Sequence, residues 1–243
     1  MSRPEMWKLE AKDSDTLELS IYSTVEGDSY DLWTGKTIES ETSAKHFKAE
    51  LDKHPNAKEI RVYINSLGGS VVEGLAICNQ LKHHSAHKTV VIDGFACSIA
   101  SVIAMAGDTV IMPRSAMMMI HNPWTIALGN AEELRKTADD LDKLAEGVRQ
   151  AYLEKAGDKL DESKLVEMLK AETYLTAAEC IALGLADAYE EEKPEEPEAE
   201  PEEKVQARAK VEQARQEAAR LAGKNELTAR REKAVAVIEK YFS

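Results

Sequence analysis

Two periodicities of apolar residues alternate along the first 189 residues, and this alternation limits the possible folds more than any other feature. Residues 17–21 are apolar at every second position, as in a strand, whereas residues 44–51 are apolar at helical spacing, behind possible N-caps at Ser40 or Thr42. Further strands are predicted at 60–64, 89–92, 110–112 and 117–120, and further helices at 72–81, 99–106 and 131–156. Strands that alternate with helices predict an α/β layered fold with largely parallel sheets.

The longest predicted helix runs from Ala131 to Ala156, and Asn130 with Glu133 has the form of a capping box at its start. An apolar stripe follows the helix through Leu134, Ala138, Leu141, Leu144, Val148 and Tyr152. At about 1.5 Å per residue the helix is about 39 Å long, which is more than a compact domain of this size needs. We expect a contact between copies of the chain, and packing within the chain is the alternative.

Charge divides the chain into three parts, because residues 1–189 carry −10, residues 190–203 carry −8 and residues 204–243 carry +5. The acidic, proline-containing part cannot bury a core, so we expect an extended linker there. The last part is rich in helix-forming residues but poor in large apolar ones. We therefore expect a folded domain over 1–189, a linker over 190–203, and a tail over 204–243 that is helical against a partner or disordered.

Composition excludes several classes of protein. A net charge of −13 argues against a protein that binds nucleic-acid phosphates. The sequence has no long apolar run and no signal peptide, so we expect no membrane association and a cytoplasmic location. Cys78, Cys97 and Cys180 are odd in number and lack paired spacing, and the histidines of segment 83–87 have no acidic or cysteine cluster beside them. We therefore expect no disulfide, no metal and no cofactor.

The segment 91–101 contains the first candidate for chemistry. A buried strand is predicted to break at Gly94, and a helix is predicted to begin at Ser98 or directly after it. A hydroxyl at the start of a helix lies close to free backbone N–H groups, which stabilise a developing anion. Ser98 is therefore a candidate nucleophile, and an ordinary N-cap serine is the alternative.

Three other positions complement this serine. Gly68 and Gly69 close a predicted strand and could direct an N–H toward an oxyanion. His121 follows an apolar strand and could accept a proton as a general base. Glu172 precedes an apolar turn and could orient that histidine as the third member of a triad. For each residue a purely structural or solvated role is the alternative.

Four segments occur in a fixed order along the chain. They are Tyr63-Ile64-Asn65-Ser66-Leu67-Gly68-Gly69, Gly94-Phe95-Ala96-Cys97-Ser98, Met119-Ile120-His121-Asn122-Pro123, and Tyr174-Leu175-Thr176-Ala177 with Gly184-Leu185-Ala186-Asp187. Their order and spacing resemble the motifs of the Clp protease proteolytic subunit, ClpP, over about residues 15–189. The segments at 6–11, 120–124 and 172–177 further resemble the phage-encoded ClpP-like head-maturation (prohead) proteases.

This resemblance implies a ClpP/crotonase-type fold, a spiral of ββα units with residues 131–156 as a projecting handle helix. It implies homo-oligomeric rings assembled through that handle, around active sites that hydrolyse polypeptides. Capsid or scaffold proteins are the substrates implied by the phage branch, in the host cytoplasm or the prohead. The tail over 204–243 has no counterpart in ClpP.

Carried over by position, the resemblance implies that Ser98 is the nucleophile and His121 the general base. It places Glu172 where ClpP has an aspartate, and it implies that Gly69 and Ile99 supply the N–H groups of the oxyanion hole. Asp187 is the alternative acid if Glu172 does not serve.

The chain departs from ClpP at two further places. Leu67 replaces a proline, and the strand that binds substrate is shorter at 124–129, so peptide selectivity is not carried over.

Two other functions remain open. One is a crotonase-type acyl-CoA enzyme, which shares the fold and the paired glycines, and the other is an assembly factor whose triad no longer acts.

Overall fold

The structure is a computed structural model that describes residues 7–11 and 15–190. The tail predicted over 204–243 lies outside these residues, and so does the linker predicted over 190–203 except for Glu190. The Glu190 N–H donates a hydrogen bond to the Met112 carbonyl at 3.0 Å, beyond the end of the last strand.

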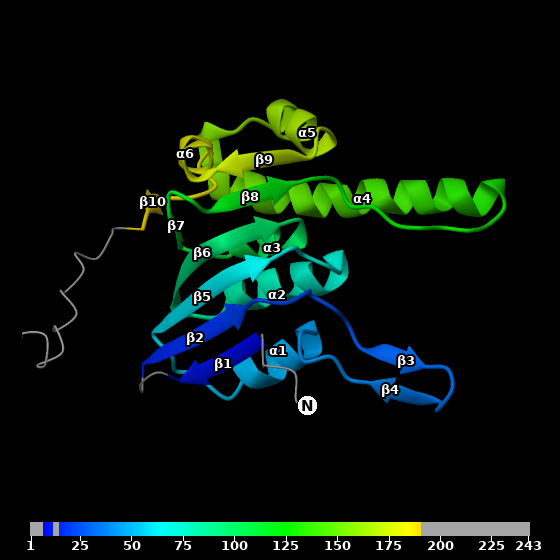
Figure 1. Ribbon diagram of the computed structural model, residues 1–243, viewed down its shortest axis with the longest axis horizontal. Helices are drawn as coiled ribbons and strands as arrows, with labels where there is room; N and C mark the ends of the chain where they lie inside the picture. Colours follow the sequence, from blue (N-terminus) through cyan, green and yellow to red (C-terminus); the bar gives the residue numbers. More distant parts are fainter. Residues whose placement is uncertain (1–6, 12–14, 191–243) are drawn as a thin grey trace, which may run out of the picture. The chain divides into compact units, whose positions relative to one another are not determined.

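One mixed sheet of eight strands organises the described residues (Figure 1). Its main path is β1 (Trp7–Ala11), β2 (Thr16–Ile21), β5 (Glu59–Ser66), β6 (His87–Cys97), β7 (Thr109–Met112) and β10 (Ala188–Tyr189). Only β1 is antiparallel to its neighbour on this path, and the pairs from β2 to β10 are all parallel. The α/β fold with a largely parallel sheet, predicted from the alternating periodicities, is confirmed.

The strand β6 changes partner along its length. Its first half pairs with β7, and its last three residues pair with β8 (Met117–Ile120), which in turn pairs antiparallel with β9 (Thr173–Thr176). The prediction that the strand breaks at Gly94 is therefore wrong. Gly94 lies where the register with β5 shifts, and a Cβ there would come within 2.8 Å of Asn65 Oδ1, so glycine permits the strand to continue.

The described residues also contain six α-helices and one short 3₁₀ helix. They are α1 (Ala44–Leu51), α2 (Val71–His83), α3 (Ile99–Ala104), α4 (Ala131–Ala156), η1 (Gly157–Lys159), α5 (Glu162–Lys170) and α6 (Ala177–Ala182). Successive pairs from α1 to α4 contact each other, and α1, α2 and α3 lie behind the strands in Figure 1. No helix among the described residues is long and apolar enough to cross a bilayer.

Helix starts follow from local side-chain chemistry. Ser43, rather than Ser40 or Thr42, caps α1, because its Oγ accepts the His46 N–H while Ser40 and Thr42 bond to each other. Asn130 and Glu133 form the predicted capping box of α4. These caps satisfy backbone N–H groups that have no partner inside the helix.

The helix α4 is buried along only half of its length. Its C-terminal half buries five residues against the core, namely Ala145, Val148, Ala151, Tyr152 and Ala156. Its N-terminal half extends beyond the sheet in Figure 1, and Leu134 there is 44% exposed. Packing within the chain therefore accounts for the second half of the apolar stripe, and the first half is less buried, with Leu134 and Ala138 exposed and Leu141 partly buried.

Two strands that the periodicity does not reveal form a separate hairpin, β3 (Ser29–Asp31) and β4 (Lys36–Ile38). Asp31 accepts hydrogen bonds from the Trp33 and Thr34 backbone at the turn, and Gly35 has a φ of +66°. Leu32 and Trp33 are 88% and 95% exposed, so the hairpin adds nothing to the core.

The contact between α2 and α3 gives a test of the packing. Gly74 on α2 is buried, and a Cβ there would lie 2.1 Å from Ile99 Cγ1 at the start of α3. We expect Gly74→Ala to lower the free energy of unfolding by about 1–3 kcal/mol, because overpacking forces the helices apart.

The matched control is Gly147→Ala on α4, where the nearest atom to a new Cβ would be Leu75 Cδ1 at 3.7 Å. There the same substitution should raise the free energy of unfolding by about 0.5–1 kcal/mol, since alanine favours the helix. Denaturation followed by circular dichroism at equal protein concentration measures both. Equal effects of the two substitutions would contradict the packing described here.

Candidate active site

Ser98 occupies an unusual backbone conformation at the junction of β6 and α3. Its φ is +54° and its ψ is −130°, which is rare for a residue with a side chain and costs about 1–3 kcal/mol. Its N–H donates to the Met119 carbonyl at 2.8 Å, which holds the end of β6 against β8. Such a turn carries the side chain out of the sheet at the start of a helix.

The Ser98 hydroxyl does not cap α3. The side chains of Ser43, Ser70, Asn130, Asp161 and Thr176 each accept an N–H of the helix that follows them, whereas Ser98 makes no such bond. The alternative of an ordinary N-cap serine therefore does not hold. The hydroxyl is instead free to face another group.

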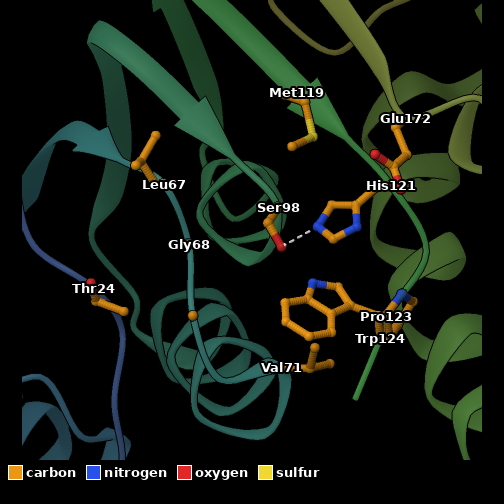
Figure 2. Close-up of a pocket in the computed structure, with 11 residues that line it drawn as sticks. Thr24, Leu67, Gly68, Val71, Ser98, Met119, His121, Pro123, Trp124 and Glu172 are labelled. Carbon is orange, nitrogen blue, oxygen red and sulfur yellow. Dashed lines mark hydrogen bonds between the residues drawn. The ribbon is translucent and has the colours of Figure 1, made fainter. Parts of the chain in front are cut away.

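That group is His121, directly after β8. His121 Nε2 lies 2.7 Å from Ser98 Oγ, within hydrogen-bond distance, and both side chains are partly buried (Figure 2). The pairing of Cys97 with Met119 sets this geometry, because it brings the ends of β6 and β8 together. A neutral imidazole in this position can accept the hydroxyl proton.

Glu172 lies beside the same histidine. The β8–β9 register pairs Ile120 with Thr173, so its continuation places Glu172 opposite His121. The Leu169 carbonyl accepts both the Asn122 N–H at 3.3 Å and the Glu172 N–H at 3.4 Å, which ties the two loops together.

The Glu172 backbone is also unusual, with a φ of +49° directly after α5. This position usually holds glycine. The side chain is exposed and lines the cavity that holds Ser98 and His121. Within the described part of the chain, no hydrogen bond joins the Glu172 carboxylate to His121. The structure thus brings Glu172 to the site without a direct bond to the imidazole.

Asp187, the alternative acid, has other partners. Its carboxylate accepts the Val110 N–H at 2.6 Å and pairs with Lys155 at 2.7 Å. It does not line the cavity around Ser98.

The loop after β5 passes directly beside Ser98. Gly68 has a φ of +100°, and a Cβ there would lie 2.7 Å from Ser98 Cβ. Gly69 has a φ of +148°, and a Cβ there would lie 2.1 Å from the Val25 carbonyl oxygen. Only glycine fits at either position, because both the backbone conformation and the space exclude a side chain.

Hydrogen bonds fix this loop while leaving two N–H groups free. The Gly68 N–H donates to Ser66 Oγ, and the Gly68 carbonyl accepts from Val25 N–H at 2.9 Å. Among the described residues, no hydrogen bond uses the N–H of Gly69 or of Ile99. A Cβ on Gly68 would lie 3.2 Å from Ile99 N. The structure thus places Ile99 N close to the glycine loop that contains Gly69.

These residues line a cavity of about 720 Å³, large enough for several residues of an extended peptide. The wall is formed by Thr24, Leu67, Gly68, Gly69, Val71, Ser98, Met119, His121, Pro123, Trp124 and Glu172. Trp124 is 71% exposed, and Figure 2 shows its indole beside His121. Apolar side chains next to a reactive hydroxyl suit a ligand with both apolar groups and a carbonyl.

Two wall residues have no signal in the sequence, since Thr24 and Val71 come to the cavity only through the fold. The close approach of Gly68 to Ser98 could have been suspected from the paired glycines. Cys97 is buried, and burial raises the pKa of its thiol, so this neighbour of Ser98 stays protonated. All three cysteines are free and buried. No group of three metal-ligating side chains occurs within residues 7–11 and 15–190.

The glycine loop gives a direct test of the site. We expect Gly68→Ala to reduce the rate at which a fluorophosphonate labels Ser98 by about 100-fold, because the new methyl group displaces the hydroxyl. Gly35→Ala is the control, since Gly35 also has a positive φ but its nearest neighbour would be Tyr30 Oη at 3.5 Å in the hairpin. Labelling located by mass spectrometry reports both, and equal rates in the two variants would contradict the assignment.

Comparison with known proteins shows the family of this chain. A model of the Clp protease family matches residues 20–193. The ATP-dependent Clp protease proteolytic subunit of Bacteroides fragilis is 30% identical over 186 residues, which cover 74% of this chain and 87% of that protein. The subunit of Ligilactobacillus salivarius is 31% identical over 140 residues, covering 56% and 70% of the two chains.

A further relative is the ATP-dependent Clp protease proteolytic subunit 2 of Parasynechococcus marenigrum, which is 29% identical over 170 residues, or 67% of this chain and 84% of that one. Nothing in these matches is specific to the phage-encoded branch, which stays a prediction. The matched residues run from the end of β2 through β10 and include the segments that carry Ser98 and His121. The chain therefore belongs to the Clp protease family, whose members are serine-type peptidases.

Proposed function

We propose that this protein is a serine endopeptidase that uses Ser98, His121 and Glu172 as its catalytic residues. The observation that carries the proposal is the 2.7 Å contact between Ser98 Oγ and His121 Nε2 in an open cavity. A serine hydroxyl is a weak nucleophile by itself, and an adjacent imidazole is the usual means of activating it.

The reaction follows from this geometry. Ser98 Oγ attacks the carbonyl carbon of the scissile peptide bond while its proton passes to His121 Nε2. The carbonyl oxygen becomes an anion, which the N–H groups of Gly69 and Ile99 stabilise. His121 then gives its proton to the leaving amine, and the C–N bond breaks. Water, deprotonated by His121, attacks the carbonyl carbon of the resulting ester. The C–Oγ bond then breaks, the acid is released, and His121 returns the proton to Ser98 Oγ.

Glu172 is the third member in this proposal. Its position opposite His121 in the β8–β9 register and its place on the cavity wall support the role. A carboxylate near an imidazole stabilises the imidazolium that forms when the histidine takes the proton. Glutamate is one methylene longer than the aspartate of ClpP, so its carboxylate approaches the ring from a different backbone position. Asp187, held by Val110 and Lys155, is a structural residue in this proposal.

The two other functions are less well supported. A crotonase-type acyl-CoA enzyme has no need of a hydroxyl in contact with an imidazole, and Ser98 and His121 form that contact. An assembly factor with a lost triad would have no reason to keep Ser98 in a costly conformation.

We also propose that the exposed half of α4 joins copies of the chain into a ring, and that the substrates are phage capsid or scaffold proteins. The exposed apolar residues of that half, such as Leu134, support the first statement. The resemblance to head-maturation proteases supports the second. The division into a protease domain over 1–189, a linker and a tail completes this proposal, and the +5 charge of residues 204–243 suits an acidic partner surface.

We expect Ser98→Ala to abolish hydrolysis and His121→Ala to reduce it by about 10⁴-fold or more, because either change removes the activated nucleophile. The assay uses the purified full chain with casein and with a capsid precursor of a tailed phage, followed by mass spectrometry of the products. Native mass spectrometry of the same samples checks that assembly is unchanged.

Cleavage of the capsid precursor at defined sites, with little cleavage of casein, supports the phage substrate class. Hydrolysis of casein alone would retain the peptidase and contradict the phage substrate. Retained hydrolysis in Ser98→Ala would contradict the catalytic mechanism itself.

We expect Glu172→Gln to lower kcat by about 10- to 1,000-fold, because it preserves the shape but removes the charge that stabilises the imidazolium. Asp187→Asn should instead leave kcat within about twofold and lower the melting temperature, since it weakens the ion pair with the largely buried Lys155. Steady-state kinetics and thermal denaturation separate the two effects. If the Glu172→Gln variant is fully active and the Asp187→Asn variant is inactive, Asp187 is the catalytic acid and the assignment of Glu172 is wrong.

A further inference from the structure

A chain of two buried hydroxyls leads from the long helix α4 to the peptide bond that follows Ser98. Tyr152 on α4 is 1% exposed, and its hydroxyl lies 2.6 Å from Ser101 Oγ. Ser101 on α3 is fully buried, and its Oγ lies 2.5 Å from the Ser98 carbonyl oxygen. Ser101 Oγ also lies 3.4 Å from the carbonyl of Met119, which accepts the Ser98 N–H.

The direction of these hydrogen bonds follows from the available protons. The Ser98 carbonyl can only accept, so the Ser101 hydroxyl donates to it. The single Ser101 proton is then used, and the Tyr152 hydroxyl must donate to Ser101 Oγ. Burial raises the pKa of Tyr152, so the phenol keeps the proton that it donates. Hydroxyls linked in this order polarise one another, which strengthens the hydrogen bond from Ser101 Oγ to the Ser98 carbonyl.

The carbonyl at the end of the chain belongs to the same peptide unit as the Ile99 N–H. In a trans peptide the C=O and the N–H point in opposite directions. The Ser98 carbonyl is held from the inside by two donors, Ser101 N–H at 3.0 Å and Ser101 Oγ. The Ile99 N–H therefore points away from Ser101, and a Cβ on Gly68 would lie 3.2 Å from Ile99 N.

This arrangement matters because Ser98 is strained at a φ of +54°. A rotation of the peptide unit after Ser98 would relieve part of the strain and turn the Ile99 N–H out of the site. The bond from Ser101 Oγ opposes that rotation, since the rotation would leave a buried hydroxyl without its acceptor.

We propose that Ser101 and Tyr152 are positioning residues, whose linked hydroxyls hold the Ser98–Ile99 peptide so that its N–H faces the developing oxyanion. Neither residue touches the substrate, and the inference rests on the proposed function of the site. It extends that function to two residues outside the triad and the oxyanion hole, one of them on the handle helix. Polarisation of the carbonyl also makes the N–H of the same peptide a stronger donor.

The test compares Tyr152→Phe, Ser101→Ala and the double variant in the full chain. Phenylalanine removes only the phenol oxygen, and alanine suits the small-residue helix α3, so the packing is preserved. We expect Ser101→Ala to lower kcat by about 10- to 100-fold and Tyr152→Phe by about tenfold, with KM within about twofold, because only the transition state carries the oxyanion.

A transition-state analogue separates positioning from structure. A peptide aldehyde accepts Ser98 Oγ at its carbonyl carbon and places an oxygen where the oxyanion forms. Its inhibition constant should rise in each variant by the same factor by which kcat/KM falls. The double variant should match Ser101→Ala in kcat, because the phenol acts only through Ser101, and should melt at a higher temperature than Ser101→Ala, because no buried hydroxyl is left unpaired.

Ser43→Ala is the matched control. Ser43 is also a buried serine, 3% exposed, whose hydroxyl donates to Ser40 and accepts from His46 in the cap of α1. This variant should lower the melting temperature without a change in kcat or in the inhibition constant of the aldehyde.

Three outcomes overturn the inference. They are an unchanged kcat in folded Ser101→Ala and Tyr152→Phe, a lower kcat with unchanged affinity for the aldehyde, and an equal loss of kcat in Ser43→Ala. The rate of Ser98 labelling by a fluorophosphonate replaces kcat if the wild type cleaves no peptide tested. If the wild type, Ser101→Ala and Tyr152→Phe are all fully active, this inference is refuted and the proposed function is retained. A wild type that is neither labelled nor active refutes the proposed function, and the inference with it.

Discussion

A backbone hydrogen bond of 2.8 Å from the Ser98 N–H to the Met119 carbonyl joins the end of β6 to the end of β8. Because β6 leaves β7 and continues beside β8, the two strands end at the same level, and the residues that follow them meet. The contact between Ser98 and His121 is a consequence of this change of partner. The place of Glu172 depends on it as well, since β9 takes its register from β8.

The first turn of α3 is surrounded by positions that exclude a side chain. A Cβ on Gly68 would meet Ser98, and a Cβ on Gly74 would meet Ile99. The backbone of the glycine loop and the helix α2 can therefore approach α3 closely, and Gly69 lets the same loop cross the Val25 carbonyl. Close packing against the glycine loop and α2 holds a peptide unit that is strained in its own conformation.

Local patterns predict the parts of this arrangement that depend on local chemistry. The two-residue period indicates β2 and β5, the capping box at Asn130 indicates the start of α4, and the motifs around Ser98 and His121 indicate the reactive pair. The continuation of β6 past Gly94 could not be predicted, because it depends on pairing with β8, a tertiary contact. The proposed role of Ser101 could not be predicted either. A serine in a helix of small residues has no special signal, and its hydrogen bond with Tyr152 is a tertiary contact.

The few buried polar side chains hold particular backbone segments in place through hydrogen bonds. Apart from Tyr152 and the cysteines, the described residues bury four polar or charged side chains: Ser43, Ser66, Lys88 and Ser101. A buried hydroxyl is tolerated only where it is hydrogen-bonded. Ser66 Oγ donates to the Ser23 carbonyl and accepts the Gly68 N–H, so it fixes the loop that presents Gly69. Ser101 fixes the peptide that presents Ile99. In the proposed mechanism the N–H groups of Gly69 and Ile99 bind the oxyanion, so two of the four buried polar side chains, Ser66 and Ser101, would each hold one of these two backbone segments in place.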